Sequence, residues 1–488
     1  MTHSSRPAFD RALAHLVALT DGVELARDSA FIAQPVALAT RFRAAEAAAA
    51  ALAGGAALAN QMAIARGLPG SSVRVDSRHA EASLLSFAHL HFTDPERAPA
   101  GRQAPEQRTA AAGFFPTADG RWVYLHPGFP HNTQGLLNLL GVADDRSAVR
   151  SSGERQAELR SAVGDAVAGY SAETLEQAIG AAGLCGAMVR SAEEWDASRP
   201  GVLLAARPVV EIIQLDDSPP EPLPAFEGRA LSGIRVLDLT RVLAGPTCAR
   251  TLASYGASVL RVGASELPTI PLFVADTGFG KRSTHLDLTQ PDAAQTLRRL
   301  LRDCDVFSQS YRSGAMDRLG FGVTDVAQLR PGIVYVSINC YGHEGPWRQW
   351  PGWEQLAQTV TGMALAQGED TDEQGRPTLL PAAVTDYTTG YLAAFGALAA
   401  LERRARVGGS YWVRVSLART AMWIRQLGRR RTLRARPLAD SEITAWQDVM
   451  DTPWGPAHYL RPAVNLSAMP AGWDTPPVPV GTHAPSFD

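Results

Sequence analysis

The chain has 488 residues, of which 45% are hydrophobic and 19% are charged, with 43 Gly and 33 Pro. This composition excludes a disordered chain, and the length exceeds that of one ordinary compact unit, so we expect two or three packed regions. The formal net charge of −3 gives no electrostatic reason to expect a nucleic-acid partner or an anionic membrane, because both need a local excess of Lys and Arg.

Residues 1–76 are expected to form a helical segment. The N-terminal stretch mixes charged and apolar residues and never builds the apolar run that a signal peptide requires. Residues 44–65 are mainly alanine, interrupted by polar residues and by Gly54 and Gly55. This pattern predicts a closely packed soluble helix, with a break at the glycine pair as an open alternative, and not a membrane span.

Residues 77–215 are expected to form a small α+β domain, which ends at a proline-rich seam. Four prolines fall within residues 219–224, and they forbid a continued helix or a central strand. We therefore expect residues 216–230 to be an extended linker and place a domain boundary there.

Residues 231–425 show a repeated alternation of short β-prone runs and helical patterns. Strands are predicted at 233–239, 258–262, 305–308 and 332–338, with helices at 247–255 and 291–302 between them. The alternation predicts an α/β fold, with a Rossmann-like parallel sheet covered by helices and ligands beyond the carboxyl ends of its strands. Residues 426–488 would form a tail that returns to this sheet domain.

Two residue classes narrow the chemistry further. The four cysteines are far apart and form no C-x-x-C pair, so we expect neither disulfides nor a structural zinc site, and a cytoplasmic location. The basic cluster near residue 430 is expected to be a solvated face or a contact between domains and not a phosphate track. The cluster comprises Arg425, Arg429, Arg430, Arg431, Arg434 and Arg436, and the cysteines are Cys185, Cys248, Cys304 and Cys340.

An internal similarity appears at a fixed offset of 340 residues. Leu52-Ala53 matches Leu392-Ala393, and Val73-Arg-Val75 matches Val413-Arg-Val415. Alanine bias inflates such matches, so coincidence stays open as the alternative. The V-R-V that follows a turn in both places favours a real duplication, in which residues 1–76 partly repeat residues 386–416.

Generic nucleotide-binding motifs fail in this chain. Residues 276–283 carry Gly278, Gly280 and Lys281, but Ala275 stands where a Walker loop needs its first glycine, and Arg282 stands where Ser or Thr would bind magnesium. The dinucleotide fingerprint fails because Ser283 replaces its third glycine. Strong signatures of serine hydrolases, zincins and calcium sites are also missing from the sequence, so no metal is expected.

A set of ordered segments is more informative. They are Leu231 to Pro246 (LSGIRVLDLTRVLAGP), Lys281 to Leu288 (KRSTHLDL), Tyr311 to Gly320 (YRSGAMDRLG), Tyr341 to Pro346 (YGHEGP), Pro351 to Gln358 (PGWEQLAQ) and Val384 to Gly390 (VTDYTTG). Together they resemble the class III CoA-transferase family of the CaiB/BaiF type, which includes formyl-CoA and carnitine-CoA transferases, over essentially all of residues 231–425.

The resemblance implies that Asp386 is the nucleophilic aspartate. The run from Tyr387 to Arg404 is helical in pattern, so Asp386 is expected at or next to the N-cap, where free N–H groups and the helix dipole would keep its carboxylate ionised. By position in the family pattern, the residues that contact CoA are Val242, Leu243, Ala244, Leu286, Thr289, Ser310, Tyr311, Arg312, Arg318, Trp353 and Glu354. Arg312 and Arg318 would bind phosphate, with a surface salt bridge as the alternative for each.

The chain also departs from the family pattern. The family usually has a polar residue such as Gln near the position of Leu243 and an Asn at the position of Ser310. It usually has an acidic residue where Gly263 stands. Racemases of the family have a histidine beside the position of Trp353, which is lacking here, and His343 is expected to make a structural hydrogen bond instead. CoA affinity or orientation would be altered by these changes.

The arrangement of parts suggests two family copies fused, the first without its sheet domain and the second without its small domain. In the 340-residue register Glu46 stands opposite Asp386, as a remnant or as a second acid. Family members form interlocked homodimers, which the fused order puts in doubt.

The function that the resemblance implies is transfer of CoA from an acyl-CoA thioester to a carboxylic acid through a covalent aspartyl intermediate. CoA and acyl-CoA would then be substrates, and the partners small molecules. Two alternatives stay open, an acyl-CoA isomerase or racemase and a non-catalytic CoA-binding paralogue.

Overall fold

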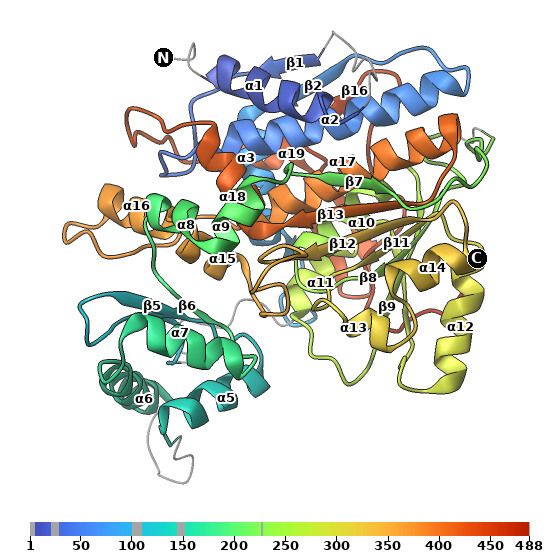
Figure 1. Ribbon diagram of the computed structural model, residues 1–488. Coiled ribbons are helices and arrows are strands. Elements are labelled where there is room, and N and C mark those ends of the chain that lie inside the picture. Colours follow the sequence, from blue (N-terminus) through green and yellow to red (C-terminus); the bar gives the residue numbers. More distant parts are fainter. Residues whose placement is uncertain (1–4, 21–28, 100–109, 144–151, 226–227, 488) are drawn as a thin grey trace.

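A computed structural model describes residues 5–20, 29–99, 110–143, 152–225 and 228–487. At its centre lies a seven-stranded sheet with the order β10-β9-β8-β11-β12-β13-β7 (Figure 1). All neighbouring strands are parallel except β7, which pairs antiparallel with β13 at one edge. The strands are β7 (Glu211–Gln214), β8 (Arg235–Leu239), β9 (Ser258–Gly263), β10 (Lys281–His285), β11 (Val306–Gln309), β12 (Val334–Asn339) and β13 (Tyr411–Ser416).

Helices cover both faces of this sheet, which confirms the predicted α/β class. The central strands β8, β11 and β12 are mainly apolar because both faces of the sheet are covered there, as in other parallel sheets. One face packs against α10 (Ala244–Ser254) and α17 (Val384–Val407), and the other against α12 (Pro291–Arg302) and α14 (Val323–Leu329). The short helix α13 (Ala315–Arg318) lies on the second face.

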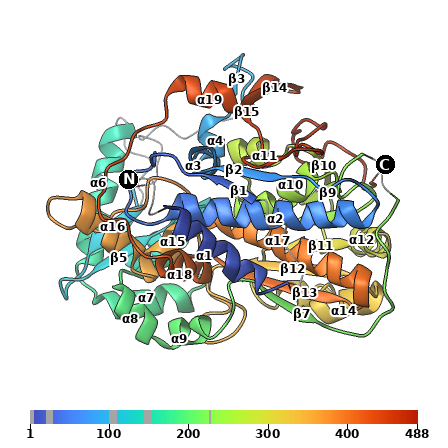
Figure 2. The same cartoon turned by 90° about the horizontal axis from the view of Figure 1, so that it is seen from above.

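A further helical layer covers α17. Helix α2 (Ala44–Ala65) runs alongside it, and α1 (Ser5–Val17) packs on α2 (Figure 2). The expected alternative of a break at the glycine pair is wrong, because α2 is continuous through Gly54. A Cβ atom there would lie 3.1 Å from the ring of Phe395, so glycine serves close helix packing. Among the described residues α2 alone is long and apolar enough to cross a membrane, but 89% of its apolar window is buried inside the protein.

A smaller α+β unit stands apart from these layers, at the lower left of Figure 1. Its antiparallel sheet has the order β4-β5-β6, and three helices pack on it around buried residues such as Leu136, Val163 and Leu175. The elements are β4 (Gly113–Pro116), β5 (Trp122–Leu125), α5 (Pro130–Leu140), α6 (Ser152–Val167), α7 (Ala172–Ala181) and β6 (Gly186–Met188).

The remainder of the range 77–215 lies elsewhere, because its ends pair with other sheets. Strand β7 joins the main sheet, where Glu211 lies opposite Arg414 and forms an ion pair with it. Strand β3 joins the sheet β14-β15-β3, beside α11. The elements of this range are α3 (Ser77–Ser83), α4 (Ser86–His89), β3 (His91–Phe92), α8 (Ala192–Ala197) and α9 (Arg199–Ala205). The later elements near β3 are α11 (Pro271–Thr277), α19 (Asp440–Trp446), β14 (Gln447–Thr452) and β15 (Gly455–Leu460).

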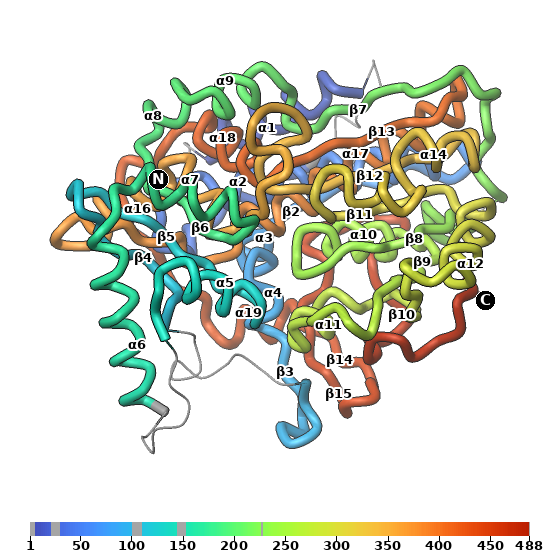
Figure 3. Tube along the Cα trace, turned by 60° about the horizontal axis from the view of Figure 1, so that its bottom comes forward, coloured from blue at the N-terminus to red at the C-terminus, as the bar shows by residue number. Residues whose placement is uncertain are grey.

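The proline-rich segment and the chain end both run without helix or strand. Residues 215–225 cross the C-terminal end of α17, where the Glu221 N–H donates to the Arg404 carbonyl oxygen. The last described residues pass β10, where the His483 N–H donates to the Ser283 carbonyl oxygen over 2.7 Å (Figure 3). Hydrogen bonds therefore hold both segments against the sheet domain.

The offset of 340 residues has a structural counterpart. Helices α2 and α17 begin at residues 44 and 384, and β2 (Val73–Asp76) corresponds to residues 413–416 of β13. A fourth sheet, with β1 (Ser29–Ile32) and β16 (Asn465–Leu466), has the order β1-β2-β16. Its edge strand β16 pairs antiparallel with β2 as β7 pairs with β13, and in the same register: Asn465 faces Arg74 and Glu211 faces Arg414.

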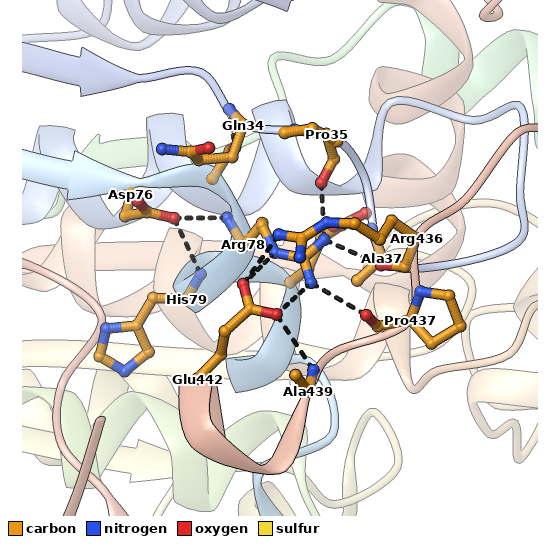
Figure 4. Close-up of polar contacts among 12 residues, drawn as sticks. Gln34, Pro35, Ala37, Asp76, Arg78, His79, Arg436, Pro437, Ala439 and Glu442 are labelled. Atoms are coloured by element: carbon orange, nitrogen blue, oxygen red, sulfur yellow. Dashed lines mark hydrogen bonds and ion pairs between the residues drawn. The ribbon is translucent and has the colours of Figure 1, made fainter. Parts of the chain in front are cut away.

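Arg78 at the start of α3 ties the N-terminal half to the chain's C-terminal part (Figure 4). Arg78 is buried, with 1% of the residue exposed, and its guanidinium donates to both carboxylate oxygens of Glu442, at 2.7 and 2.8 Å. It also donates to the carbonyl oxygens of Pro35, Arg436 and Pro437. Five donated bonds use the full donor capacity of an arginine.

Replacing Arg78 with alanine should therefore lower the free energy of unfolding by about 3 kcal/mol, because three carbonyl oxygens lose their donor. Arg78→Lys should recover only part of this loss, since an ammonium cannot reproduce the planar fork. Urea unfolding of both variants checks the prediction, with the exposed Arg6→Ala as the control. Equal stability of Arg78→Ala and the parent protein would contradict it.

Candidate active site

A cavity of about 240 Å³ opens at the carboxyl ends of β8, β11 and β12. The loops that follow these strands supply Val242, Ser310 and Trp353, and the first turn of α17 supplies Asp386. In an open parallel sheet this edge is where ligands are expected.

The structure brings together nine of the twelve predicted site residues and leaves three outside. Leu286 is buried in the core on the face of α12, and the exposed Thr289 donates its hydroxyl to Asp287. Arg318 ends α13 away from the cavity lining. The residues that line the cavity are Val242, Leu243, Ala244, Ser310, Tyr311, Arg312, Trp353, Glu354 and Asp386.

The loop after β8 is held in an uncommon conformation. Val242 has a φ of 70°, and among the described residues it is the one non-glycine with positive φ. A β-branched residue in this region is strained, and such strain concentrates at functional sites. Lys281 links the two sides of the loop. Its ammonium donates to the Asp238 carboxylate over 2.7 Å and to the Pro246 carbonyl oxygen over 2.8 Å.

Three arginines give the first cavity a positive wall: Arg241, Arg312 and Arg348. The guanidinium of Arg241 lies 5.0 Å from the ring centre of Phe129, and Arg312 donates to the Gly183 carbonyl oxygen over 2.9 Å. Phe129 and Gly183 belong to the small α+β unit, so this unit closes one side of the cavity. Arg348 was not predicted as a site residue, and its place in the Gly/Pro/Trp-rich loop after β12 is the signal that would have indicated it.

Asp386 is buried in the first turn of α17, where its environment differs from the expectation. The helix begins at Val384, so Asp386 is inside the helix and not at its N-cap. The carboxylate of Glu354 accepts the N–H groups of Thr385 and Asp386, at 3.1 and 2.6 Å, and the Thr385 hydroxyl. Glu354, at the start of α15 (Glu354–Val360), thus takes the helix-capping role that had been expected of Asp386.

The carboxyl groups of Asp386 and Glu354 disfavour each other's ionisation. Burial raises the pKa of Asp386 well above its ordinary range, and the charge of Glu354 raises it further. Burial also raises the pKa of Glu354, against the opposing effect of its hydrogen bonds. Like charges in one buried site disfavour double ionisation, so one proton is retained between them more readily than by free carboxyl groups.

A second cavity, of about 440 Å³, lies on the other side of the same groups. Asp386, Glu354, Trp353 and Val242 line both cavities. Asp386 is therefore reached from two sides, one with basic side chains and the other mainly apolar.

Two histidines clarify the racemase alternative. His343 is bonded to Ser337, with 2.7 Å between Nε2 and Oγ, as expected of a structural histidine. His126, from the small unit, was not predicted, yet it packs edge-on against Trp353 with ring centres 4.6 Å apart and lines the second cavity. Burial lowers the pKa of His126 to about 4, so this imidazole is neutral at pH 7.

Glu46, which stands opposite Asp386 in the 340-residue register, has different surroundings. Its buried carboxylate pairs with Arg43 at 3.0 Å and Arg430 at 2.7 Å. Other members of the basic cluster also pair with carboxylates: Arg425 with Asp196, Arg429 with Asp370, and Arg436 with Glu442. The arginines near residue 430 thus make contacts between chain segments.

The family model described as CoA-transferase family III matches residues 2–214 and 231–430. An acyl-CoA transferase of Gibberella moniliformis is 34% identical over 318 residues, which cover 63% of this chain and 55% of the relative. The acetyl-coenzyme A transferase nodX of Hypoxylon pulicicidum is 31% identical over 391 residues, 73% of this chain and 64% of the relative. The chain thus spans between about half and two thirds of the length of these relatives.

Among solved structures, the orthorhombic form of Rv3272 from M. tuberculosis matches with a TM-score of 0.38 and 30% sequence identity. The match covers 41% of this chain and 56% of that one.

Proposed function

The chain belongs to CoA-transferase family III, and on that premise we propose that it moves CoA from an acyl-CoA thioester to a carboxylic acid through a covalent intermediate on Asp386. The observation that carries the proposal is the position of Asp386, a buried carboxyl group on the wall shared by two cavities. The relatives' names, acyl-CoA transferase and acetyl-coenzyme A transferase, support the reaction class.

The proposed reaction begins when the ionised Asp386 attacks the thioester carbonyl carbon. The C–S bond breaks, CoA leaves as the thiolate, and a mixed anhydride remains on the enzyme. The thiolate then attacks the aspartyl carbonyl, which releases the first carboxylate and leaves an aspartyl-CoA thioester. The acceptor carboxylate attacks that thioester to form a new anhydride, and CoA returns to its acyl carbonyl, which regenerates Asp386.

We assign the first cavity to CoA because of its charge. The guanidinium groups of Arg241, Arg312 and Arg348 suit phosphate oxygens, which they pair more strongly than a neutral donor would. Glu354 is proposed to act as a positioning residue: it holds the first turn of α17, and its charge controls the protonation of Asp386.

Trapping with hydroxylamine tests the covalent route. Incubation with an acyl-CoA and hydroxylamine should release free CoA and leave a hydroxamate on Asp386, detectable by peptide mass spectrometry. Tight CoA binding without any adduct would support the alternative of a non-catalytic CoA-binding protein.

Replacing Glu354 with glutamine should shift the acid limb of the pH profile of kcat/KM to lower pH by about one unit. The amide removes the charge that raises the pKa of Asp386, while its oxygen can still accept a helix N–H. Initial rates between pH 4.5 and 8 check the shift. Asp287→Asn, at a partly exposed position outside both cavities, is the control and should leave the limb unchanged. An upward shift in Glu354→Gln would contradict the assigned role.

A second candidate is proton exchange at the acyl α-carbon, and the position of His126 on the same cavity as Asp386 favours it. A neutral imidazole and a protonated carboxyl group form a base and acid pair for such exchange. Incubation of an acyl-CoA in D₂O distinguishes the two: deuterium at the α-carbon without any acceptor acid would support isomerisation over transfer.

A further inference from the structure

We infer that the second cavity binds the acyl group, and that this group is an apolar chain or ring without a second carboxylate. The inference rests on the proposed function and adds the substrate class to it. It follows from the composition of the cavity wall and the charges that face it.

The wall includes four segments that are far apart in the sequence, together with the loops that carry Val242 and Trp353. Leu85 and Phe87 come from the start of α4, Ile270 and Phe273 from the start of α11, and Leu379 from the loop before α17. Phe87 and Phe273 contact each other with ring centres 4.9 Å apart. The fourth segment contains His126 and Gly128 of the small unit.

The volume and the lining suit an apolar ligand. Ligand pockets commonly measure about 300–1,000 Å³, and the cavity of about 440 Å³ falls in this range. Removal of the ligand's apolar surface from water would favour binding in this cavity. Asp386 lines this cavity, so an acyl group bound there can bring its carbonyl carbon to the carboxylate.

A second carboxylate would find no partner charge in this cavity. Among the lining residues that the structure describes there is no Lys or Arg, and His126 is neutral at pH 7. Arg241 lines a separate small hollow behind Ile270 and Phe273, where it donates to the Pro268 carbonyl oxygen. Glu354 and Asp386 would repel another negative charge. The polar groups of the wall, the amides of Gln355 and Gln358, are uncharged, so the desolvation of a second carboxylate is not offset by an opposite charge.

Pentanoyl-CoA and glutaryl-CoA provide a matched test because both acyl chains have five carbons. In single-turnover CoA release in the presence of hydroxylamine, the second-order rate constant for pentanoyl-CoA should be at least about 100-fold above that for glutaryl-CoA. Equal values, or a preference for glutaryl-CoA, would overturn the inference while leaving the proposed function intact.

Equilibrium binding to Asp386→Asn separates the cavity from the chemistry. Pentanoyl-CoA should bind more tightly than CoA itself, and glutaryl-CoA should not. If the parent protein releases no CoA from either ester but this binding order holds, the proposed function fails and the cavity assignment stands. If both esters bind alike, the assignment fails whatever the activity.

A pair of variants tests the missing charge directly. Leu379 is half-buried in a loop, and Leu379→Arg adds a cation to the wall whereas Leu379→Met keeps it apolar at similar length. Leu379→Arg should narrow the preference for pentanoyl-CoA by about 10-fold or more, and Leu379→Met should keep it. Equal ratios in the two variants would count against the inference; if Leu379→Arg does not fold, the ratio in the parent protein decides.

Discussion

Replacing Asp386 with asparagine should reduce CoA transfer by roughly 10⁴-fold or more, because the amide cannot attack a thioester and no anhydride forms. Acyl-CoA binding should persist, since the cavities on both sides keep their shape. Product formation by chromatography, together with the loss of the hydroxamate adduct, checks the result. Transfer at a rate within 10-fold of the parent would show that another group is the nucleophile.

The same substitution should stabilise the fold at neutral pH. The pKa of Asp386 is higher in the folded protein than in the unfolded chain. As the pH rises, the unfolded chain therefore loses this proton first, and the free energy of unfolding falls until the pH reaches the folded pKa. Asparagine carries no titrating proton, so Asp386→Asn does not lose stability in this way as the pH rises. The thermal midpoint of Asp386→Asn should therefore exceed that of the parent at pH 7, and the difference should vanish near pH 4.

Glu46→Gln is the matched control at the corresponding position of α2. It should keep transfer activity but lower stability, because Arg43 and the buried Arg430 lose their charged partner. Asp386→Asn should therefore lose transfer activity and gain stability at pH 7, whereas Glu46→Gln should keep activity and lose stability. A loss of transfer in folded Glu46→Gln would contradict a purely structural role for this carboxylate.

The second large effect is expected at the base of the loop after β8. Lys281→Ala should lower the free energy of unfolding by about 3–5 kcal/mol, because it leaves the fully buried carboxylate of Asp238 without its cation. The Pro246 carbonyl oxygen also loses its donor, so the loop that carries Val242 should loosen and CoA affinity should fall. Urea unfolding and CoA titration measure the two consequences.

A double variant separates the charge from the packing. Asp238→Asn combined with Lys281→Met removes both charges, while the asparagine oxygen can still accept the Thr240 N–H. This variant should lose less stability than the sum of the losses in Asp238→Asn and Lys281→Met, which is a positive coupling in a double-mutant cycle. If the two losses simply add, the ion pair is not the cause.

The sheet domain is the part of the fold that the sequence predicts best. Its strands are continuous β-prone runs between Gly or Pro residues, and the predicted helix 291–302 coincides with α12. The continuity of α2 was left open, because local propensity disfavours the glycine pair and the contact with Phe395 that requires it is tertiary.

The site was predicted in part. Residues carried over from the family pattern line the first cavity where they stand in the loops immediately after β8, β11 and β12. Leu286, Thr289 and Arg318 lie outside the described cavities. The protonation of Asp386 could not be predicted, since Glu354 is 32 residues away in sequence and only the fold brings it to the start of α17. The second cavity could not be predicted either, because segments far apart in the sequence build it.

Other expectations stay predictions: the cytoplasmic location, the homodimer and the origin of the chain in two fused copies. The matching register of β7 on β13 and of β16 on β2 supports the fusion hypothesis. Any homodimer has to use a surface other than the α2 face of α17, which is buried within the chain.

The contact between α2 and α17 also has an evolutionary consequence. In a symmetric pair of identical helices every substitution occurs twice, so a bulky residue must fit against its own symmetry mate. Here the ring of Phe395 fits against Gly54, while the 340-residue counterparts of these two residues are Gly55 and Ala394. Joined in one polypeptide, the two helices are free to evolve unequal partners, large against small, as in a heterodimer.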